Sequence, residues 1–301
     1  MGLEELCALI DRHARRGTPP VEGLLLSRSE RPTAPEPSLT GPVLALVAQG
    51  AKRTGLGERT YEYRAGQYLV VTVDLPVTGH FSEASPGRPF LGVGLELRPA
   101  AIADLLLQHA TAPGPARPPG GAVSGIAVST APYELVDALV RLLRLLERPA
   151  DRPVLAPLIE KEILWRLVTG EQGAVIRQIG LADSTLSQIG RAVRWIRDHH
   201  ASALRVGELA DMCAMSASSF HRHFRAVTAM TPLQFQKNIR LQQARLLLMS
   251  RDDDVEDVGY AIGYDSPSQF SREYRRQYGL PPGRDAERLR GAERGSRASR
   301  A

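Results

Sequence analysis

The sequence has few of the residues that export, disulfide frameworks and membrane insertion require. Only Cys7 and Cys213 occur among 301 residues, and residues 1–16 (MGLEELCALIDRHARR) lack the apolar core of a signal peptide. Two distant cysteines without an export signal indicate a reducing compartment. No stretch approaches the roughly 18 uninterrupted apolar residues of a membrane-spanning helix. These absences predict a cytoplasmic protein that does not bind a membrane.

Catalytic and metal-binding patterns are also missing. The chain has neither a G-x-S-x-G motif nor a Walker A loop. In the N-terminal half His80 and His109 are far apart, and Glu83 alone accompanies His80, which is too few ligands for a metal. His221 and His223 are two residues apart on a predicted helix, so their side chains point in different directions. We therefore expect no enzymatic activity, no metal and no cofactor.

Positive charge is concentrated in the C-terminal part of the chain. Residues 186–301 carry 19 Lys and Arg against 13 Asp and Glu, a net charge of +6, whereas residues 1–185 carry 19 against 20. An excess of positive charge in one region favours a polyanionic partner for that region.

Short apolar runs and turn residues alternate in the first half of the chain. Residues 1–17 have the spacing of an amphipathic helix. The runs VLALVAQG, TYEY, QYLVVTVDL and FLGVGLEL follow between residues 42 and 97, separated by turn residues such as Thr78-Gly79. Residues 112–121 (APGPARPPGG) are expected to be a loop, followed by one more strand, AVSGIAV. Short strands at this spacing favour a small barrel or sandwich.

Two amphipathic helices are predicted after residue 132, in residues 133–147 and 153–170. One apolar stripe consists of Leu135, Leu139, Leu142, Leu143 and Leu146, and the other of Leu155, Ile159, Ile163 and Leu167. Such stripes either cover an open side of the β domain or form a dimer interface, and the pattern does not choose between the two.

One sequence unit occurs twice in the last third of the chain. FHRHFRAVTAMTP begins at Phe220 and FSREYRRQYGLPP begins at Phe270, so aromatic, arginine and proline positions match at an offset of 50 residues. Upstream the offset is 49, which pairs Ala210 with Gly259. The repeat therefore extends over two predicted helices in each copy.

Each copy has the pattern of a helix-turn-helix unit. In the first, a short helix is followed by a turn at Ala214 and by a second helix that Ser216 can cap. In the second, Gly263 is the turn residue and either Asp265 or Ser266 is the cap. The second helix of each copy has an aromatic inner face and an outer face of Ser, His, Gln and Arg, which is typical of a helix that enters a major groove.

A long helix is predicted between the two copies, over residues 232–249. At 1.5 Å per residue it is about 27 Å long. That length is comparable with the spacing of about 34 Å between successive major grooves. We expect it to hold two recognition helices near that separation.

These residues resemble the AraC/XylS family of bacterial transcription regulators. The resemblance rests on VGELADMCAMSASSFHRHFRAVTAMTPLQFQKNIRLQQAR followed by VGYAIGYDSPSQFSREYRRQYGLPP, and covers roughly residues 186–282. PVLALVAQGAKRTGLGERTYEYRAGQYLVVTVDLPVTG is similar to the cupin-like N-terminal domain of one AraC-type subgroup. The resemblance implies a sequence-specific regulator that activates or represses promoters, with double-stranded promoter DNA and RNA polymerase as partners.

The family pattern also implies which side chains meet DNA. Carried onto this chain, the base contacts are Ser218, His221, Arg222, Ser268, Gln269 and Arg272. The phosphate contacts are expected at Ser216, Arg225, Arg275 and Arg276. Gly259 departs from the family, which usually has alanine there; because glycine costs a helix about 1 kcal/mol, the second unit is expected to be the looser one.

The predicted fold class is α+β, with a cupin-like β domain and an all-α domain of two helix-turn-helix units joined by a long helix. We expect a sensory or dimerisation domain over residues 1–170, a linker over 171–184, a DNA-binding domain over 185–284 and a disordered basic tail over 285–301.

Three interpretations of the β domain stay open. It encloses a small-molecule effector, with Tyr61, Tyr63, Tyr68 or His80 lining the pocket. Alternatively it only forms a homodimer and binds nothing, which gives a constitutive regulator. A metal-dependent cupin enzyme fused to a DNA-binding module is the third, and metal analysis of the purified protein would detect it.

Overall fold

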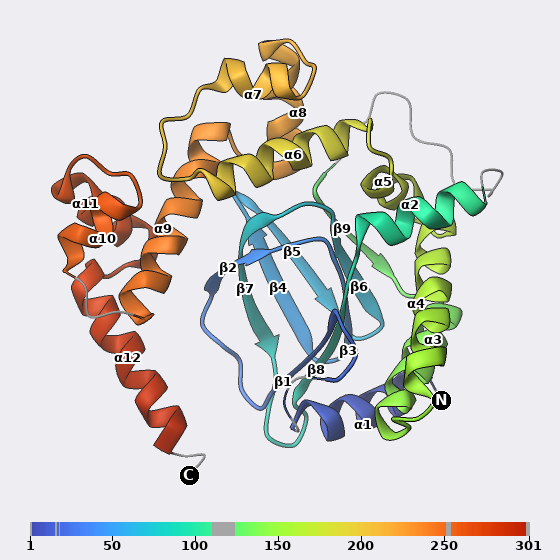
Figure 1. Cartoon of the computed structure of the whole chain (residues 1–301). Coiled ribbons are helices and arrows are strands. Elements are labelled where there is room, and N and C mark those ends of the chain that lie inside the picture. Colours follow the sequence, from blue (N-terminus) through green and yellow to red (C-terminus); the bar gives the residue numbers. More distant parts are fainter. Residues whose placement is uncertain (1, 16, 18, 110–123, 251–253, 299–301) are drawn as a thin grey trace.

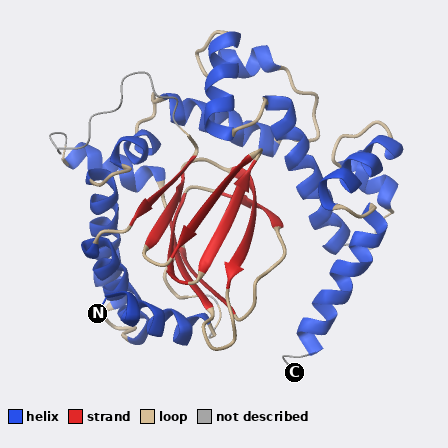
Figure 2. Cartoon of the chain, turned by 180° about the vertical axis from the view of Figure 1, so that it is seen from behind, coloured by secondary structure: helices blue, strands red, loops and turns tan. Residues whose placement is uncertain are grey.

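A two-sheet β structure lies at the centre of the molecule, with helices around it (Figures 1 and 2). The computed structural model describes residues 2–15, 17, 19–109, 124–250 and 254–298. All strand pairs described are antiparallel, in a five-stranded sheet of order β1-β8-β3-β6-β9 and a four-stranded sheet of order β2-β7-β4-β5. The α+β class predicted from the sequence is confirmed, with the sheets first and the helical region after them.

The three central strands of the five-stranded sheet read as nearly continuous apolar runs. The outer side of this sheet is covered by the N-terminal helix α1 (Gly2–Ala14), which buries Leu6, Leu9 and Ile10 (Figure 1). A strand that is buried on both faces gains from apolar residues at every position, which explains runs such as VLALVAQ. The strands are β1 (Leu24–Ser29), β3 (Val43–Gln49), β6 (Gln67–Val71), β8 (Phe90–Glu96) and β9 (Ile126–Thr130).

The four-stranded sheet is more polar, and most of it was not predicted. Its strands are β2 (Glu36–Thr40), β4 (Ala51–Leu56), β5 (Arg59–Arg64) and β7 (Leu75–Glu83). The predicted turn at Thr78-Gly79 is wrong, because β7 continues through both residues and pairs with β2 and β4 on its two sides. Cross-strand hydrogen bonds hold Gly79 in a strand that its local sequence does not favour. The predicted loop 112–121 lies outside the described residues.

The leucine stripe predicted in residues 133–147 is part of the chain's own core. Helix α3 (Tyr133–Arg144) buries Leu135, Leu139, Leu142 and Leu143 against α1 and α4, and Leu145–Glu147 continues it as a 3-10 turn. Helix α4 (Arg152–Thr169) buries Ile163 and Leu167, but its Leu155 is 40% exposed. The α3 stripe therefore packs within the chain and is not an exposed dimer interface.

The predicted linker holds a helix. Helix α5 (Gly173–Gly180) buries Ile176 and Ile179 and packs against α2 (Pro99–Gln108). A Cβ atom at Gly180 would come within 2.8 Å of the backbone nitrogen of Ala103, so glycine permits this close packing. Helix α6 (Thr185–Asp198) then begins at Ser184, whose side chain accepts a hydrogen bond from the Ser187 amide at 3.0 Å.

Further helices follow in the described C-terminal residues. They are α7 (Val206–Met212), α8 (Ala217–Thr228), α9 (Pro232–Ser250), α10 (Val255–Ala261), α11 (Pro267–Tyr278) and α12 (Pro282–Ala298). The predicted disordered tail is wrong over residues 285–298, which belong to α12. Asp285 and Ala286 are buried in this helix and attach it to its neighbours, which the polar composition of the segment did not reveal.

Among the described residues, the buried hydrophobic side chains form two clusters. The larger one runs through the β sheets, α1–α6 and the first helix-turn-helix unit, and includes Phe220 and Phe224. The smaller one belongs to the second unit and includes Leu241, Phe270 and Tyr274. Helix α9 contributes to both. In the described part of the chain, no helix is long and apolar enough to cross a membrane.

Candidate nucleic-acid interface

Helix α8 is positioned by a side-chain cap and by its aromatic inner face. The Ser216 hydroxyl accepts a hydrogen bond from the Ser219 amide at 3.3 Å, which satisfies one of the free amides at the start of the helix. Phe220 and Phe224 are fully buried, with ring centroids 5.4 Å apart, and Phe224 meets Phe235 of α9 edge to face at 5.6 Å. This packing fixes which side of α8 faces outward.

The outer side of α8 carries the predicted contact residues. Ser218, His221, Arg222 and Arg225 are all exposed. The Arg222 guanidinium lies 3.4 Å from the Ser219 hydroxyl and is held by no carboxylate among the described residues. An exposed arginine of this kind has its donors available for an acceptor in solution.

Helix α11 repeats this arrangement in the second unit. Ser266, rather than Asp265, is its cap and accepts a hydrogen bond from the Gln269 amide at 3.4 Å. Phe270 and Tyr274 are fully buried on its inner side. The exposed side chains on its outer side are Ser268, Gln269, Arg272, Arg275 and Arg276. The structure thus presents the sequence-predicted side chains on two separate outward faces.

A small ionic network joins α11 to α9 beside Gln269, one of the predicted base contacts, whose side chain also hydrogen-bonds to the Glu273 carboxylate. Lys237 Nζ of α9 lies 2.7 Å from Glu273, and the Tyr264 hydroxyl donates to Glu273 at 2.6 Å. Burial alone would raise the pKa of Glu273, but the hydrogen bonds from Lys237 and Tyr264 hold it below its ordinary value. The carboxylate is therefore ionised at neutral pH and helps to orient α11.

The turns between the paired helices have left-handed backbones. Ala214 has φ of +52° and Gly263 has φ of +88°, and both stand at the predicted turn positions. A Cβ atom at Gly259 would lie 3.1 Å from the Phe270 ring, which contacts the glycine directly. The departure from alanine at this position therefore accompanies close packing between α10 and α11.

Arg240, which was not predicted to have any role, connects the two units. Its guanidinium donates to the carbonyl oxygens of His200, Ala201 and Ser202, at 2.6, 3.2 and 3.1 Å, in the loop before α7. It also donates at 2.8 Å to the carbonyl of Gly263 in the turn of the second unit. Burial lowers the pKa of Arg240, which nevertheless remains charged. A single side chain of α9 thus holds the segment before α7 and the turn before α11.

The first unit is also attached to the β domain. The Gly125 amide donates to the Val227 carbonyl of α8 at 2.9 Å, and Arg197 of α6 lies 2.6 Å from Asp74 in the segment between β6 and β7. Gln242 of α9 donates to the Ser38 carbonyl of β2 at 3.4 Å. These contacts connect the β domain to α8, α6 and α9, respectively.

The β domain contains a cavity, and one of the four predicted effector residues lines it. Its volume is about 370 Å³, and Tyr63 is among the lining residues. Tyr61 instead approaches Ser124 at 3.3 Å, Tyr68 is buried elsewhere in the core, and His80 does not line the cavity either. The prediction missed Lys52, Thr54 and Ser38, because the strands that carry them were not recognised. Across the described residues, no group of three or more His, Cys, Asp and Glu side chains is placed to hold a metal ion.

Comparison with protein families identifies the chain. Residues 20–175, slightly more than half of the sequence, match the model described as the N-terminus of AraC-type transcriptional regulators. The chain belongs to the AraC-type transcriptional regulators. Residues 209–288 of this AraC-type chain match a helix-turn-helix domain model, which covers α8 and α11. The sequence resemblance to the family is thereby confirmed.

Known proteins similar to this AraC-type chain include curated regulators and a solved structure. It is 32% identical over 109 residues to the HTH-type transcriptional activator RhaS of Escherichia fergusonii, and 30% identical over 143 residues to RhaS of Citrobacter koseri. These matches span 35% and 45% of this chain, but only 39% and 49% of the relatives' own lengths. The crystal structure of an apo ToxT variant from Vibrio cholerae has a TM-score of 0.53 at 8% identity, over 90% of this chain and 100% of ToxT, so the two share a fold.

Proposed function

We propose that the chain is a sequence-specific DNA-binding transcription regulator that reads two successive major grooves with α8 and α11. The observation that carries the proposal is the repeated arrangement of these helices. Each has a buried aromatic inner side, a serine cap and an exposed outer side with arginine at the matching positions Arg222 and Arg272. Membership of the AraC-type family supports the same activity.

The exposed side chains divide into two roles. Ser218, His221 and Arg222 on α8, with Ser268, Gln269 and Arg272 on α11, are assigned to base edges, because arginine pairs with guanine and glutamine with adenine. Further along the helices, Arg225, Arg275 and Arg276 are assigned to phosphates, together with Ser216 at the start of α8. Phosphate contacts supply affinity that depends on salt, and base contacts supply discrimination.

A binding experiment separates the two roles. The purified chain is titrated with fragments of its own upstream region at two salt concentrations, in the presence of random competitor DNA. Arg222→Ala should weaken the specific fragment by about 1–3 kcal/mol and spare random DNA, whereas Arg225→Ala should weaken both and reduce the salt slope by about 1. Equal binding of all fragments by the wild-type chain would refute sequence specificity, and an unchanged specificity ratio in Arg222→Ala would refute its assignment to a base.

The proposal includes response to a small-molecule effector bound in the β domain. The cavity between the sheets supports this, because its β2 wall is hydrogen-bonded to α9 through Ser38 and Gln242. A ligand that favours one position of β2 would shift the population of DNA-competent arrangements. A constitutive regulator would show the same operator affinity with and without every compound that stabilises the chain.

The proposal also includes activation of RNA polymerase and a homodimer. The relatives named as activators support the first, and in vitro transcription from the operator with purified polymerase tests it. For the second, Val154, Leu155 and Leu158 of α4 form an exposed apolar surface, with exposed fractions of 66%, 40% and 60%. A chain that sediments as a monomer at every concentration, with and without operator, would remove the dimer from the proposal.

A further inference from the structure

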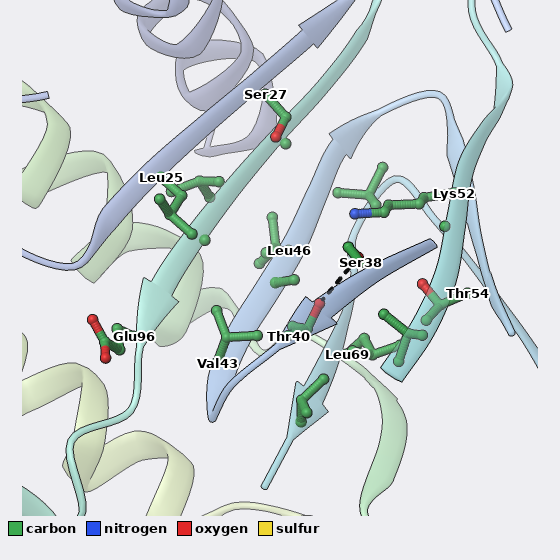
Figure 3. Close-up of a pocket in the computed structure, with 18 of the residues that line it drawn as sticks. Leu25, Ser27, Ser38, Thr40, Val43, Leu46, Lys52, Thr54, Leu69 and Glu96 are labelled. Atoms are coloured by element: carbon green, nitrogen blue, oxygen red, sulfur yellow. Dashed lines mark hydrogen bonds between the residues drawn. The ribbon is translucent and has the colours of Figure 1, made fainter. Parts of the chain in front are cut away.

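The cavity between the sheets is mainly apolar but has one cationic side chain. Its walls include Val43, Leu46, Leu69, Val77, Phe90 and Val93. Lys52 of β4 extends into the same space, and Figure 3 shows its amine directed toward the region between Leu46 and Ser38. A volume of about 370 Å³ is within the range of small-molecule sites. The cavity is therefore large enough for a compact ligand with one polar end.

The Lys52 amine has no counterion in the part of the chain that the structure describes. Among these residues no carboxylate lies within 4.0 Å of its Nζ, and the amine lies over the Phe81 ring, 5.7 Å from the centroid. Burial lowers the pKa of Lys52, and no nearby carboxylate offsets that effect. A partly buried cation without an anionic partner is incompletely solvated, so an anion that enters the cavity gains from pairing with it.

Hydroxyl groups extend the polar end of the cavity. Thr54 stands two residues after Lys52 on β4 and is buried, which places both side chains on the inner face of the strand. Burial raises the pKa of Tyr63 to about 12, although a hydrogen bond with Thr54 opposes the shift, so its hydroxyl stays protonated. These groups can donate hydrogen bonds to the oxygens of an anion that Lys52 holds.

The charges around the cavity restrict the ligand to one negative group. Among the described residues that line it, Lys52 is the single cationic one, which is too little for a phosphate dianion or a nucleotide. Glu96 also lines the cavity, is exposed, and lies on the far side from Lys52 in Figure 3. A second carboxylate at that side would be repelled by Glu96.

We propose that the cavity binds a monocarboxylate with a compact apolar body, whose carboxylate pairs with the amine of Lys52. This assignment rests on the proposed function and names the chemical class of the effector. The apolar body fills the space between the sheets, and the carboxylate displaces the water that otherwise solvates the amine. Ser38 lines the same cavity, and its backbone carbonyl accepts the hydrogen bond from Gln242 of α9, so an occupied cavity can influence the DNA-binding helices.

Isothermal titration of the full chain with matched acids and amides tests the proposal. The probes are octanoate and 4-phenylbutyrate, their primary amides, and octanedioate as the dicarboxylate. At least one acid should bind tenfold or more tightly than its amide and than octanedioate. In Lys52→Met the preference for acid over amide should disappear. Lys161→Met, which removes an exposed lysine on α4, should keep it.

Three results would refute the assignment of a monocarboxylate as the ligand. Equal affinity of acid and amide for the wild-type chain would do so without any variant, as would tight acid binding by Lys52→Met or the failure of every probe to bind. Operator binding is measured on the same samples. If the wild-type chain binds its operator but no acid, this assignment alone is refuted. If the wild-type chain shows no sequence-specific operator binding, the proposed function itself is refuted.

Discussion

Replacing the buried carboxylate of Asp285 should destabilise the second helix-turn-helix unit selectively. The side chain is fully buried, at 0% exposure, and accepts hydrogen bonds from three elements. Arg245 Nε of α9 lies at 3.0 Å, the Tyr274 hydroxyl of α11 at 2.9 Å, and Arg288 Nη2 within α12 at 2.7 Å. In Asp285→Asn the charge is lost and an amide NH₂ group faces donors, so the variant leaves part of this set unpaired.

The size of the effect follows from the burial of the partners. Removing one member of a buried ion pair costs about 3–5 kcal/mol, since the other member stays uncompensated. Arg245 is largely buried, but Arg288 is 57% exposed and regains water, so the cost should be near the lower limit. A loss of about 3 kcal/mol corresponds to a roughly 100-fold larger population of the locally open state.

Hydrogen exchange measures this population unit by unit. Amides of α10, α11 and α12 should lose about 100-fold protection, while those of α8 keep theirs, because the second unit has its own hydrophobic cluster. Glu287→Gln removes a charge from an exposed position of the same helix and serves as the control. Equal loss of protection in both variants, or loss spread evenly over α8 and α11, would refute the reasoning.

The same carboxylate predicts a pH dependence. Burial would raise the pKa of Asp285, but the hydrogen bonds from Arg288 and Tyr274 and the charge of Arg245 outweigh it and hold the pKa below its ordinary value. A pKa that is lower in the folded state stabilises the fold above the unfolded value of about 3.9 and stops doing so as the pH falls through the folded value. The stability difference between wild type and Asp285→Asn should therefore narrow below about pH 4, and a constant difference would contradict the assignment.

Three further predictions concern the joints between units. Arg240→Met keeps the aliphatic stem but removes four hydrogen bonds. Thermal unfolding should show that the free energy of unfolding falls by about 2–3 kcal/mol. DNA footprinting should then show protection of the first groove but not of the second. Gly263→Ala should lower the free energy of unfolding, measured by denaturant titration, at least twice as much as Gly279→Ala, which should lower it by roughly 1–2 kcal/mol. Both glycines have positive φ, but of the two only Gly263 would place an added Cβ against a backbone oxygen, at 2.2 Å. Equal losses in the two variants would contradict this. Asp74→Asn should lose about 1–2 kcal/mol and speed proteolysis around α6, and an unchanged digestion pattern would mean that this pair does not hold the first unit to the β domain.

The helix-turn-helix units could be predicted because their signals are local. The cap at Ser216, the aromatic spacing of Phe220 and Phe224, and the turn at Gly263 lie within a few residues of the elements that they specify. Helix α8 begins directly after the predicted cap Ser216 and spans Ala217–Thr228. The exposure of Arg222 and Arg272 follows directly from that periodicity.

The cavity and the second sheet could not be predicted, because both depend on distant pairing. Strand β7 is held by β2 and β4 on either side, and neither neighbour has an apolar pattern of its own. One feature of the sequence could have drawn attention to Lys52. It is one of three lysines in a chain rich in arginine, and it is two residues from Thr54, which places both on one face of a strand. The role of Asp285 had none, since its partners Arg245 and Tyr274 come from elsewhere in the chain.

Helix α9 has a mechanical consequence because it belongs to both hydrophobic clusters. Its first half packs in the larger cluster with the first unit through Phe235 and Ile239, and its second half carries the second unit through Ala244 and Leu248. Nineteen residues give a length of about 28 Å, so a rotation of about 5° about the anchored end moves the far end by about 2.5 Å. Hydrogen bonds to base edges tolerate only a few tenths of an ångström. A displacement of β2 at the cavity wall that leaves α8 in place would thus be enlarged along α9 before it reached α11, and under the proposed function it would disturb the fit of α11 to DNA.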